Sequence, residues 1–340
     1  MAVDAAAVLK QAAQRTLRYD FTVWFWGDAI ALDGLLEADE LLGDKKFAEF
    51  CGRYLERWAK AVPSWTDYLT PGKALIRLNE RVPQLQLGSA AERLMRWYTE
   101  ETPRGPDGVH YFRPDLPQFR TTVLVDSMYH VPSFFAQLGA STGDEAHFRS
   151  AIETWVSHAA ALTGPRGPLL FHNYDVGSGR YRGYGWGRGN GWALLGLADV
   201  LELLPESHPQ RTDLVKRFET LSRLVFDLQD RSGFWRTLLD EKEAYLESST
   251  AAFYGAAFMK GVRLGFLDER YAGSYERAWT AMLSRIDADG GFFGVSGVTW
   301  ASTAASEDLT LYQAMPTEVN VWGQGAAMRF AAERIRAGLN

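Results

Sequence analysis

One pattern of paired helices recurs along almost the whole chain. An apolar helix is followed by a short turn, an amphipathic helix, and a long loop rich in glycine, proline and aromatic residues. The final segment, QGAAMRFAAERIRAGL, is expected to pair with the opening helix over residues 3–18, which makes six helical pairs. The other pairs lie over residues 31–58, 71–100, 131–162, 192–228 and 250–286.

The two helices of a pair differ in polarity. WALLGLADVLELL is apolar almost all round, whereas RTDLVKRFETLSRLV carries charges at helical spacing. A helix that is apolar on every side is normally surrounded by protein, and a one-sided helix lies at the surface. Six inner and six outer helices predict an all-α fold, an (α/α)6 barrel formed by residues 1–340 as one domain. A linear solenoid is the alternative, but it would need polar caps on its terminal repeats.

Closure of the ring decides where the loops lie. Each long loop joins an outer helix to the next inner helix, so all of these loops emerge at the same end of the barrel. We therefore expect the binding pocket on this rim. The loops cover residues 62–72, 104–126, 164–191, 230–249 and 287–300.

Composition excludes several other classes of protein. The net charge is −6 and no block of basic residues occurs, which argues against a nucleic acid partner. No stretch reaches the roughly 18 uninterrupted apolar residues of a membrane span. The opening residues, with Asp4 and Lys10 among alanines, lack the pattern of an export signal, so a cytoplasmic protein is expected. The single cysteine, Cys51, rules out an intrachain disulfide and is interpreted as a packed thiol.

Two acids occupy equivalent places in adjacent repeats. Asp126 is a single acid among apolar neighbours at the predicted start of an inner helix, and Asp67 precedes the inner helix one repeat earlier. Burial would raise the pKa of Asp126 and a helix N-terminus would lower it. Either residue can instead be a helix cap or a turn former. Facing each other across a pocket, the two would suit acid/base chemistry on a sugar.

Histidines also fall on the expected rim. His172 lies in LLFHNYD, within the loop that precedes the fourth inner helix, and His110 and His130 are further rim candidates. A loop histidine is either a substrate contact or a hydrogen-bonded structural residue. The six histidines of the chain show no metal-binding spacing, so no metal is expected.

The segment YGWGRGNGWALLGLADVLELLP combines four glycines with Trp186 and Arg188 ahead of an apolar helix. It fits no dinucleotide-binding fingerprint, and no strand is predicted before it. Asn190 is expected to cap the helix. Arg188 can pair with a ligand carboxylate through two parallel hydrogen bonds, or it can bridge loop carbonyls. Glu247, before the fifth inner helix, is expected to cap that helix rather than to act in chemistry.

Several motifs, taken in order, resemble those of glycoside hydrolase family 105, the unsaturated rhamnogalacturonyl hydrolases. They are more distantly similar to family 88, the unsaturated glucuronyl hydrolases. The most specific segment is WGRGNGWALLGLADVLELLP. Supporting segments are TDYLTPGKAL, VDSMYHVPSFFAQLGASTGD, LLFHNYD, YLESSTAAFYGAAFMKGVRLGFLD and NVWGQGAAMRFAAER.

The resemblance implies an enzyme without metal or organic cofactor that acts on oligosaccharides left by polysaccharide lyases. Their non-reducing end is a 4,5-unsaturated uronic acid. In these families an aspartic acid protonates C4 of the vinyl ether and, as carboxylate, helps water to add at C5. The resulting hemiketal then falls apart and releases the aglycone.

Site residues follow from the same motifs. Asp126 matches the catalytic acid/base of the family, and Asp67 matches its second active-site aspartate. His172, Trp186 and Arg188 match substrate-pocket residues. The chain departs from the family pattern at Leu124, His130 and Pro132, so the sugar next to the unsaturated residue need not be rhamnose. Trp24, Trp26 and His130 complete the expected substrate-binding set, because aromatic side chains offer flat faces that suit sugar rings.

Two other functions stay open at this point. One is a conventional inverting glycosidase with Asp67 and Asp126 as acid and base. The other is a sugar binder without catalysis, or an isomerase, on the same barrel. The expected partner is an unsaturated oligosaccharide, with neither nucleic acid nor membrane, and the protein is expected to be a monomer or a homodimer.

Overall fold

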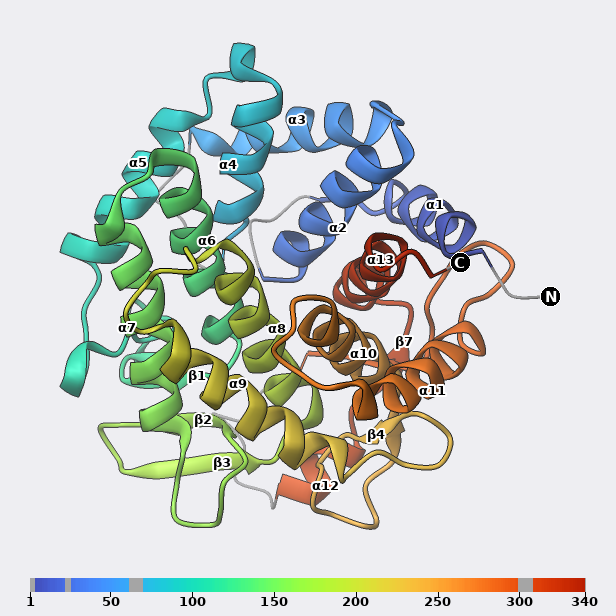
Figure 1. Cartoon of the computed structure of the whole chain (residues 1–340). Coiled ribbons are helices and arrows are strands. Elements are labelled where there is room, and N and C mark those ends of the chain that lie inside the picture. Colours follow the sequence, from blue (N-terminus) through green and yellow to red (C-terminus); the bar gives the residue numbers. More distant parts are fainter. Residues whose placement is uncertain (1–3, 22–25, 61–69, 299–307, 340) are drawn as a thin grey trace.

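Alternating inner and outer helices build the computed structural model of this protein, which describes residues 4–21, 26–60, 70–298 and 308–339. The inner helices stand side by side around a central axis (Figure 1). Consecutive members of the ring pack against each other, and the last packs against both the first and the fifth. The ring is therefore closed, as the repeat predicts. The inner helices are α2 (Trp26–Leu42), α4 (Gly72–Arg81), α6 (Ser127–Thr142), α8 (Gly187–Leu203), α10 (Ser248–Arg263) and α13 (Val321–Arg336).

Each outer helix packs mainly against the inner helix of its own pair. Helix α1 packs on α13, so the two ends of the chain form one hairpin pair, as the sequence predicts. The fold is thus the all-α (α/α)6 barrel. The outer helices are α1 (Ala5–Thr16), α3 (Lys46–Ala59), α5 (Gly88–Arg96), α7 (Glu145–Leu162), α9 (Arg211–Phe226) and α11 (Ala272–Leu283).

Local sequence sets the turns and the close approaches between helices. Gly143, with a positive φ of 73°, is the C-cap of α6, and Asp144 is the N-cap of α7, where its carboxylate accepts the N–H of Ala146 at 2.9 Å. Gly196 of α8 lies against the backbone of Met128 and Tyr129 in α6, where any Cβ would overlap that backbone. Glycine at this position therefore lets two inner helices approach closely.

The loops at the N-terminal ends of the inner helices carry short strands. One antiparallel sheet contains β1 (Thr122–Leu124), β2 (Phe171–Asp175) and β3 (Arg180–Tyr184) in that order. The prediction that no strand precedes WGRGNGW is therefore wrong, because β3 ends two residues before Trp186. The strands are too short and too irregular in polarity to give a period-2 signal. The remaining pairs are β4 (Trp235–Arg236) with β5 (Leu246–Glu247), and β6 (Val295–Ser296) with β7 (Thr317–Glu318).

Short helical segments complete the loops and turns. They include α12 (Asp308–Gln313), which packs against β3, and the π-helical turn η2 (Trp97–Glu101) that extends α5. In the described part of the chain, the 3₁₀ turns are η1 (Pro83–Leu85), η3 (Pro106–Gly108), η4 (Pro117–Phe119) and η5 (Glu269–Tyr271).

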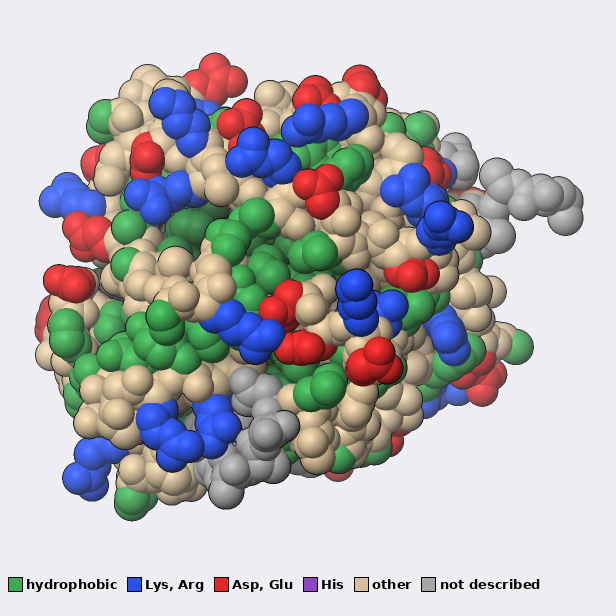
Figure 2. Space-filling model, turned by 90° about the horizontal axis from the view of Figure 1, so that it is seen from below, with side chains coloured by type: hydrophobic (Ala, Val, Ile, Leu, Met, Phe, Trp, Pro, Cys, Tyr) green, Lys and Arg blue, Asp and Glu red, His purple; other side chains and the backbone are tan. Residues whose placement is uncertain are grey.

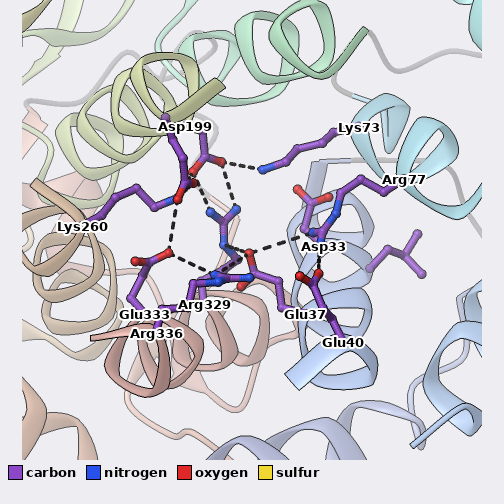
Figure 3. Close-up of polar contacts among 12 residues, drawn as sticks. Asp33, Glu37, Glu40, Lys73, Arg77, Asp199, Lys260, Arg329, Glu333 and Arg336 are labelled. Carbon is purple, nitrogen blue, oxygen red and sulfur yellow. Dashed lines mark hydrogen bonds and ion pairs between the residues drawn. The ribbon is translucent and has the colours of Figure 1, made fainter. Parts of the chain in front are cut away.

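A buried ionic network crosses the centre of the ring (Figure 3). Asp199 of α8 is its hub, since its carboxylate binds Arg329 at 2.7 Å, Lys260 at 2.7 Å and Lys73 at 2.6 Å. Burial alone would raise the pKa of Asp199, but these three cations hold it well below its usual range. Every inner helix supplies a side chain to this network: Glu37 from α2, Lys73 from α4, Tyr129 from α6, Asp199 from α8, Lys260 from α10 and Arg329 from α13.

The outer surface shows no field of a single sign on the face drawn in Figure 2. Basic and acidic side chains are interspersed there among hydrophobic ones. Within residues 4–339, outside the gaps stated above, no helix is long and apolar enough to cross a membrane. Cys51 is fully buried in α3, and burial raises the pKa of its thiol, in agreement with a packed rather than reactive residue.

Candidate active site

Asp126 occupies the N-cap position of α6, but its side chain does not cap the helix. Only 3% of the residue is exposed, and its Oδ2 atom is buried without a hydrogen-bond partner among the described residues. A structural cap would accept an N–H from the first turn of the helix. The carboxyl therefore does not stabilise the helix through a capping hydrogen bond. A buried carboxyl of this kind is typical of catalytic residues.

Burial dominates the electrostatics of Asp126. It raises the pKa of the carboxyl from its ordinary value of 3.8 to about 7, while Arg188 and a backbone hydrogen bond oppose the change. A carboxyl with this pKa is present as acid and as carboxylate near neutral pH. Such a group can donate a proton and take one back in the same turnover.

His172 lies beside Asp126. Strand β2 carries it, and its Nε2 atom is 3.8 Å from Oδ2 of Asp126. Burial and the charge of Arg188 lower the pKa of His172 to about 3, so the imidazole is neutral at physiological pH. Its ring also lies 3.9 Å from that of Trp186, centroid to centroid. The structure thus brings together Asp126, His172 and Trp186, although they are far apart in sequence.

Arg188 is buried on α8, with 1% of the residue exposed. Nη1 donates to the carbonyl oxygen of Ser296 at 2.8 Å, and Nη2 donates to that of Gly297 at 2.9 Å. The guanidinium carbon lies 4.8 Å from the centre of the Trp186 ring. Of the two arrangements considered for this residue, the structure contains the bridge to loop carbonyls. Arg188 therefore acts on Asp126 through its charge, as the pKa of that carboxyl reflects.

A belt of aromatic rings continues from Arg188 around the barrel. Its guanidinium lies 5.7 Å from the ring of Trp322, which is 4.6 Å from Trp26. Trp26 is 6.3 Å from Trp192, which is 5.0 Å from His130. His130 lies four residues after Asp126, one turn along α6. The belt thus runs from Arg188 to the helix that carries Asp126, and it places Trp26 and His130 in the same region as Asp126.

Trp192 and Trp322 were missed as site residues in the sequence. Trp192 looks like one more apolar residue of an inner helix, and Trp322 is a single aromatic residue between Val321 and Gly323. Each lies near the start of its inner helix, as Trp26 does. The recurrence of an aromatic residue in the first turns of the inner helices could have indicated these two tryptophans.

His130 is buried and neutral, because burial lowers its pKa to about 3. Its Nε2 atom has no hydrogen-bond partner among the described residues, and neither does Nε1 of Trp192. Buried polar atoms of this kind normally bind a partner, such as water or a ligand. These two atoms are candidates for contact with a polar substrate.

Two capping predictions have different outcomes. Glu247 caps α10, since its carboxylate accepts the N–H of Thr250 at 3.2 Å and the hydroxyl of Ser249 at 2.6 Å. Asn190 does not cap α8, because it lies inside the helix. Its amide instead binds both the N–H and the carbonyl of Leu170, and so fixes the start of β2 to α8.

The remaining candidates lie elsewhere or outside the described residues. His110 packs against His158 near Tyr98. Asp67 and Trp24 fall within residues 61–69 and 22–25, which the structure does not describe. Within the described ranges, no group of three His, Cys, Asp or Glu side chains is arranged to hold a metal ion.

Comparison with known proteins decides the family. The family model described as Glycosyl Hydrolase Family 88 matches residues 4–338, nearly the whole chain. The chain belongs to glycosyl hydrolase family 88. This family-88 glycoside hydrolase is 26% identical over 337 residues to the unsaturated rhamnogalacturonyl hydrolase YesR of Bacillus subtilis, covering 97% of this chain and 94% of YesR.

Solved structures share the fold of this family-88 chain. One is described as a possible member of the GH105 family from Salmonella enterica, with a TM-score of 0.87 and 22% identity. The match covers 98% of this chain and 93% of the other. Another is the unsaturated glucuronyl hydrolase of Bacillus sp. GL1, with a TM-score of 0.72 and 18% identity, covering 99% and 97% of the two chains. These matches agree with the (α/α)6 barrel predicted from the helical repeat.

Proposed function

We propose that this glycoside hydrolase removes a 4,5-unsaturated uronic acid from the non-reducing end of lyase-generated oligosaccharides, and that Asp126 is its acid and base. One observation carries the proposal. The carboxyl of Asp126 is buried, does not cap its helix, has a pKa of about 7 and lies beside His172. The names of related proteins, an unsaturated rhamnogalacturonyl hydrolase among them, support the substrate class.

The first step is proton transfer from the Asp126 carboxyl to C4 of the substrate. The electron pair of the C4=C5 bond forms the new C–H bond, and positive charge develops on C5 and the ring oxygen. The carboxylate left on Asp126 stabilises this charge at short range, because Asp126 is buried and its charge is weakly screened by solvent. Arg188 limits the cost of forming that carboxylate, since its charge favours the ionised state.

The second step is addition of water at C5. As the water oxygen bonds to C5, the Asp126 carboxylate removes a proton from that water. This restores the acid for the next turnover. The C5 hemiketal then opens to a ketone and leaves a hemiacetal at C1. Breakdown of that hemiacetal releases the aglycone as an alcohol. The net reaction consumes one water and requires one acid/base group.

The aromatic belt suits the binding of such a substrate. Trp26 and Trp322 offer ring surface near the starts of two inner helices, and the unpartnered nitrogens of His130 and Trp192 offer polar contacts. Asp67 is proposed as the second active-site carboxylate, and Trp24 as a further sugar contact, on the family motifs alone. The cytoplasmic location and the monomeric or homodimeric state stay predictions from the sequence.

Reaction in deuterium oxide tests the proposal. Hydration of the vinyl ether places one deuterium on C4 of the released uronate, which proton NMR detects, and the ultraviolet absorbance of the substrate disappears. A saturated aryl glycoside should not be cleaved. Cleavage of the saturated compound, or a product with no deuterium on C4, would favour a conventional inverting glycosidase. Binding without turnover would favour a sugar-binding protein.

A further inference from the structure

Tyr312 contacts His172 but has no role in the mechanism proposed above. It lies on α12 and is buried, with 1% exposed. Its hydroxyl oxygen is 2.5 Å from Nδ1 of His172, a short hydrogen bond. Its ring also lies 6.2 Å from that of Trp186. Segments about 140 residues apart in the chain thus meet at one imidazole.

Gly183 makes room for this contact. It lies on β3 between Arg182 and Tyr184, which pair with Asn173 and Phe171 of β2, and so it lies opposite His172. Its φ is 64°, and a Cβ at this position would overlap the Tyr312 hydroxyl and crowd the Cβ of His172. Only glycine combines this backbone conformation with the space that the tyrosine hydroxyl needs.

The opposite nitrogen of the ring faces the acid, since Nε2 of His172 is 3.8 Å from Oδ2 of Asp126. A neutral imidazole carries one proton, and the hydrogen bond made by one nitrogen decides which nitrogen carries it. If the tyrosine O–H donates to Nδ1, the proton of His172 is on Nε2, directed at Asp126. If Nδ1 donates to the tyrosine oxygen, a lone pair faces Asp126 instead.

We propose that Tyr312 is a positioning residue whose O–H donates to Nδ1 of His172 and so holds the imidazole in the tautomer with Nε2–H facing Asp126. A donor directed at the Asp126 carboxylate favours its charged state, which forms when the acid protonates the substrate. The opposite tautomer would place a lone pair against that developing charge. This inference rests on the proposed function of Asp126 and adds the residue that sets the orientation and tautomer of its neighbour.

Arg188 and Glu247 are the other charged groups to consider beside Asp126 and His172. Arg188 from α8 favours the charged form of Asp126, and its Nη1 atom lies 3.8 Å from Oε1 of Glu247 at the start of α10. A substitution at position 312 removes neither of these charges. A change of tautomer is therefore separable from a change in these charges.

The test is the Tyr312→Phe variant, with ¹⁵N-labelled histidine observed by long-range ¹H–¹⁵N NMR. Wild type should show His172, assigned by its loss in a His172→Gln variant, as the Nε2–H tautomer. Tyr312→Phe should populate the Nδ1–H tautomer. We expect kcat for an unsaturated disaccharide to fall about 10- to 100-fold, with KM changed less than threefold. The alkaline decline in the pH profile should move to higher pH, because the Asp126 carboxylate loses a hydrogen-bond donor that favours its charged form.

Tyr254→Phe is the matched control, since that buried tyrosine donates to the carbonyl oxygen of Gly187 at 2.6 Å and has no contact with His172. It should leave the His172 tautomer and the alkaline decline in the pH profile unchanged. A wild-type spectrum with His172 as Nδ1–H would overturn the proposal, even if Tyr312→Phe did not fold. A folded Tyr312→Phe protein with an unchanged tautomer would also overturn it. Because the NMR readout needs no turnover, it is independent of whether the proposed substrate is correct.

Discussion

The carboxyl of Asp126 and the imidazole of His172 face each other at 3.8 Å, both buried, with the acid shifted toward its neutral form and the base held neutral. This is unlike a salt bridge, in which each partner would favour the charged state of the other. Burial outweighs the attraction, so the pair carries no net charge of its own between about pH 3 and pH 7. The adjacent positive charge is that of Arg188.

The pH dependence of catalysis follows from this arrangement. Because Asp126 must carry a proton to start the reaction, kcat/KM should fall as pH rises through about 7. The measurement is the initial rate of absorbance loss at low substrate concentration between pH 5 and 9. A rate that stays level from pH 6 to 9 would show that another group supplies the proton.

Asp126 should also make the folded state less stable at alkaline pH. Its folded pKa of about 7 lies above its ordinary value of 3.8, so its contribution to stability is greatest below pH 4 and is lost as pH rises through 7. Asp126→Asn cannot ionise and should exceed wild type in unfolding free energy by a few kcal/mol at pH 8. Urea unfolding at pH 5 and pH 8 measures this. As a control, Asp213→Asn on the exposed surface of α9 should show no such gain.

Two buried histidines outside the site predict sensitivity to acid. The rings of His110 and His158 lie 6.1 Å apart, and burial lowers the pKa of both, that of His158 to about 4. Their neutral forms stabilise the fold above pH 6.5, and this stabilisation is lost as pH falls from 6.5 toward 4. His158→Gln should lose less unfolding free energy than wild type between pH 7 and pH 5. An equal loss in both proteins would exclude this pair as a source of acid sensitivity.

The central ionic network should be costly to break from one side. Arg329→Met leaves Asp199 and Glu37 buried with fewer cations, and we expect a loss of about 3–5 kcal/mol in unfolding free energy. The exposed pair of Arg217 with Asp213 provides a control, since Arg217→Met should cost less than about 0.5 kcal/mol. Equal effects of Arg329→Met and Arg217→Met would contradict the network's structural role.

The helical repeat was enough to predict the ring, its closure by α1 and α13, and the shared rim of the loops. These features follow from polarity patterns that each helix carries locally. The ionic network was not predicted, because Asp199 or Lys260 within an apolar helix looks like an isolated charge. Its partners come from other repeats, and only closure of the ring brings them together.

The site was predicted in part. Asp126, His172 and Trp186 do meet, since each stands next to the start of an inner helix or on the strand beside it. The bonding of Arg188 to the carbonyls of Ser296 and Gly297 could not be deduced, because those residues lie about 108 positions away along the chain. The contact between Tyr312 and His172 was hidden for the same reason.

The measurement that tests the account most directly compares wild type with Asp126→Asn on an unsaturated uronic acid disaccharide, followed by ultraviolet absorbance at pH 6. Wild type should remove the absorbance completely, and Asp126→Asn, folded to the same extent by circular dichroism, should be slower by at least about 10³-fold. Turnover by Asp126→Asn at the wild-type rate would contradict the assignment of this carboxyl as the acid.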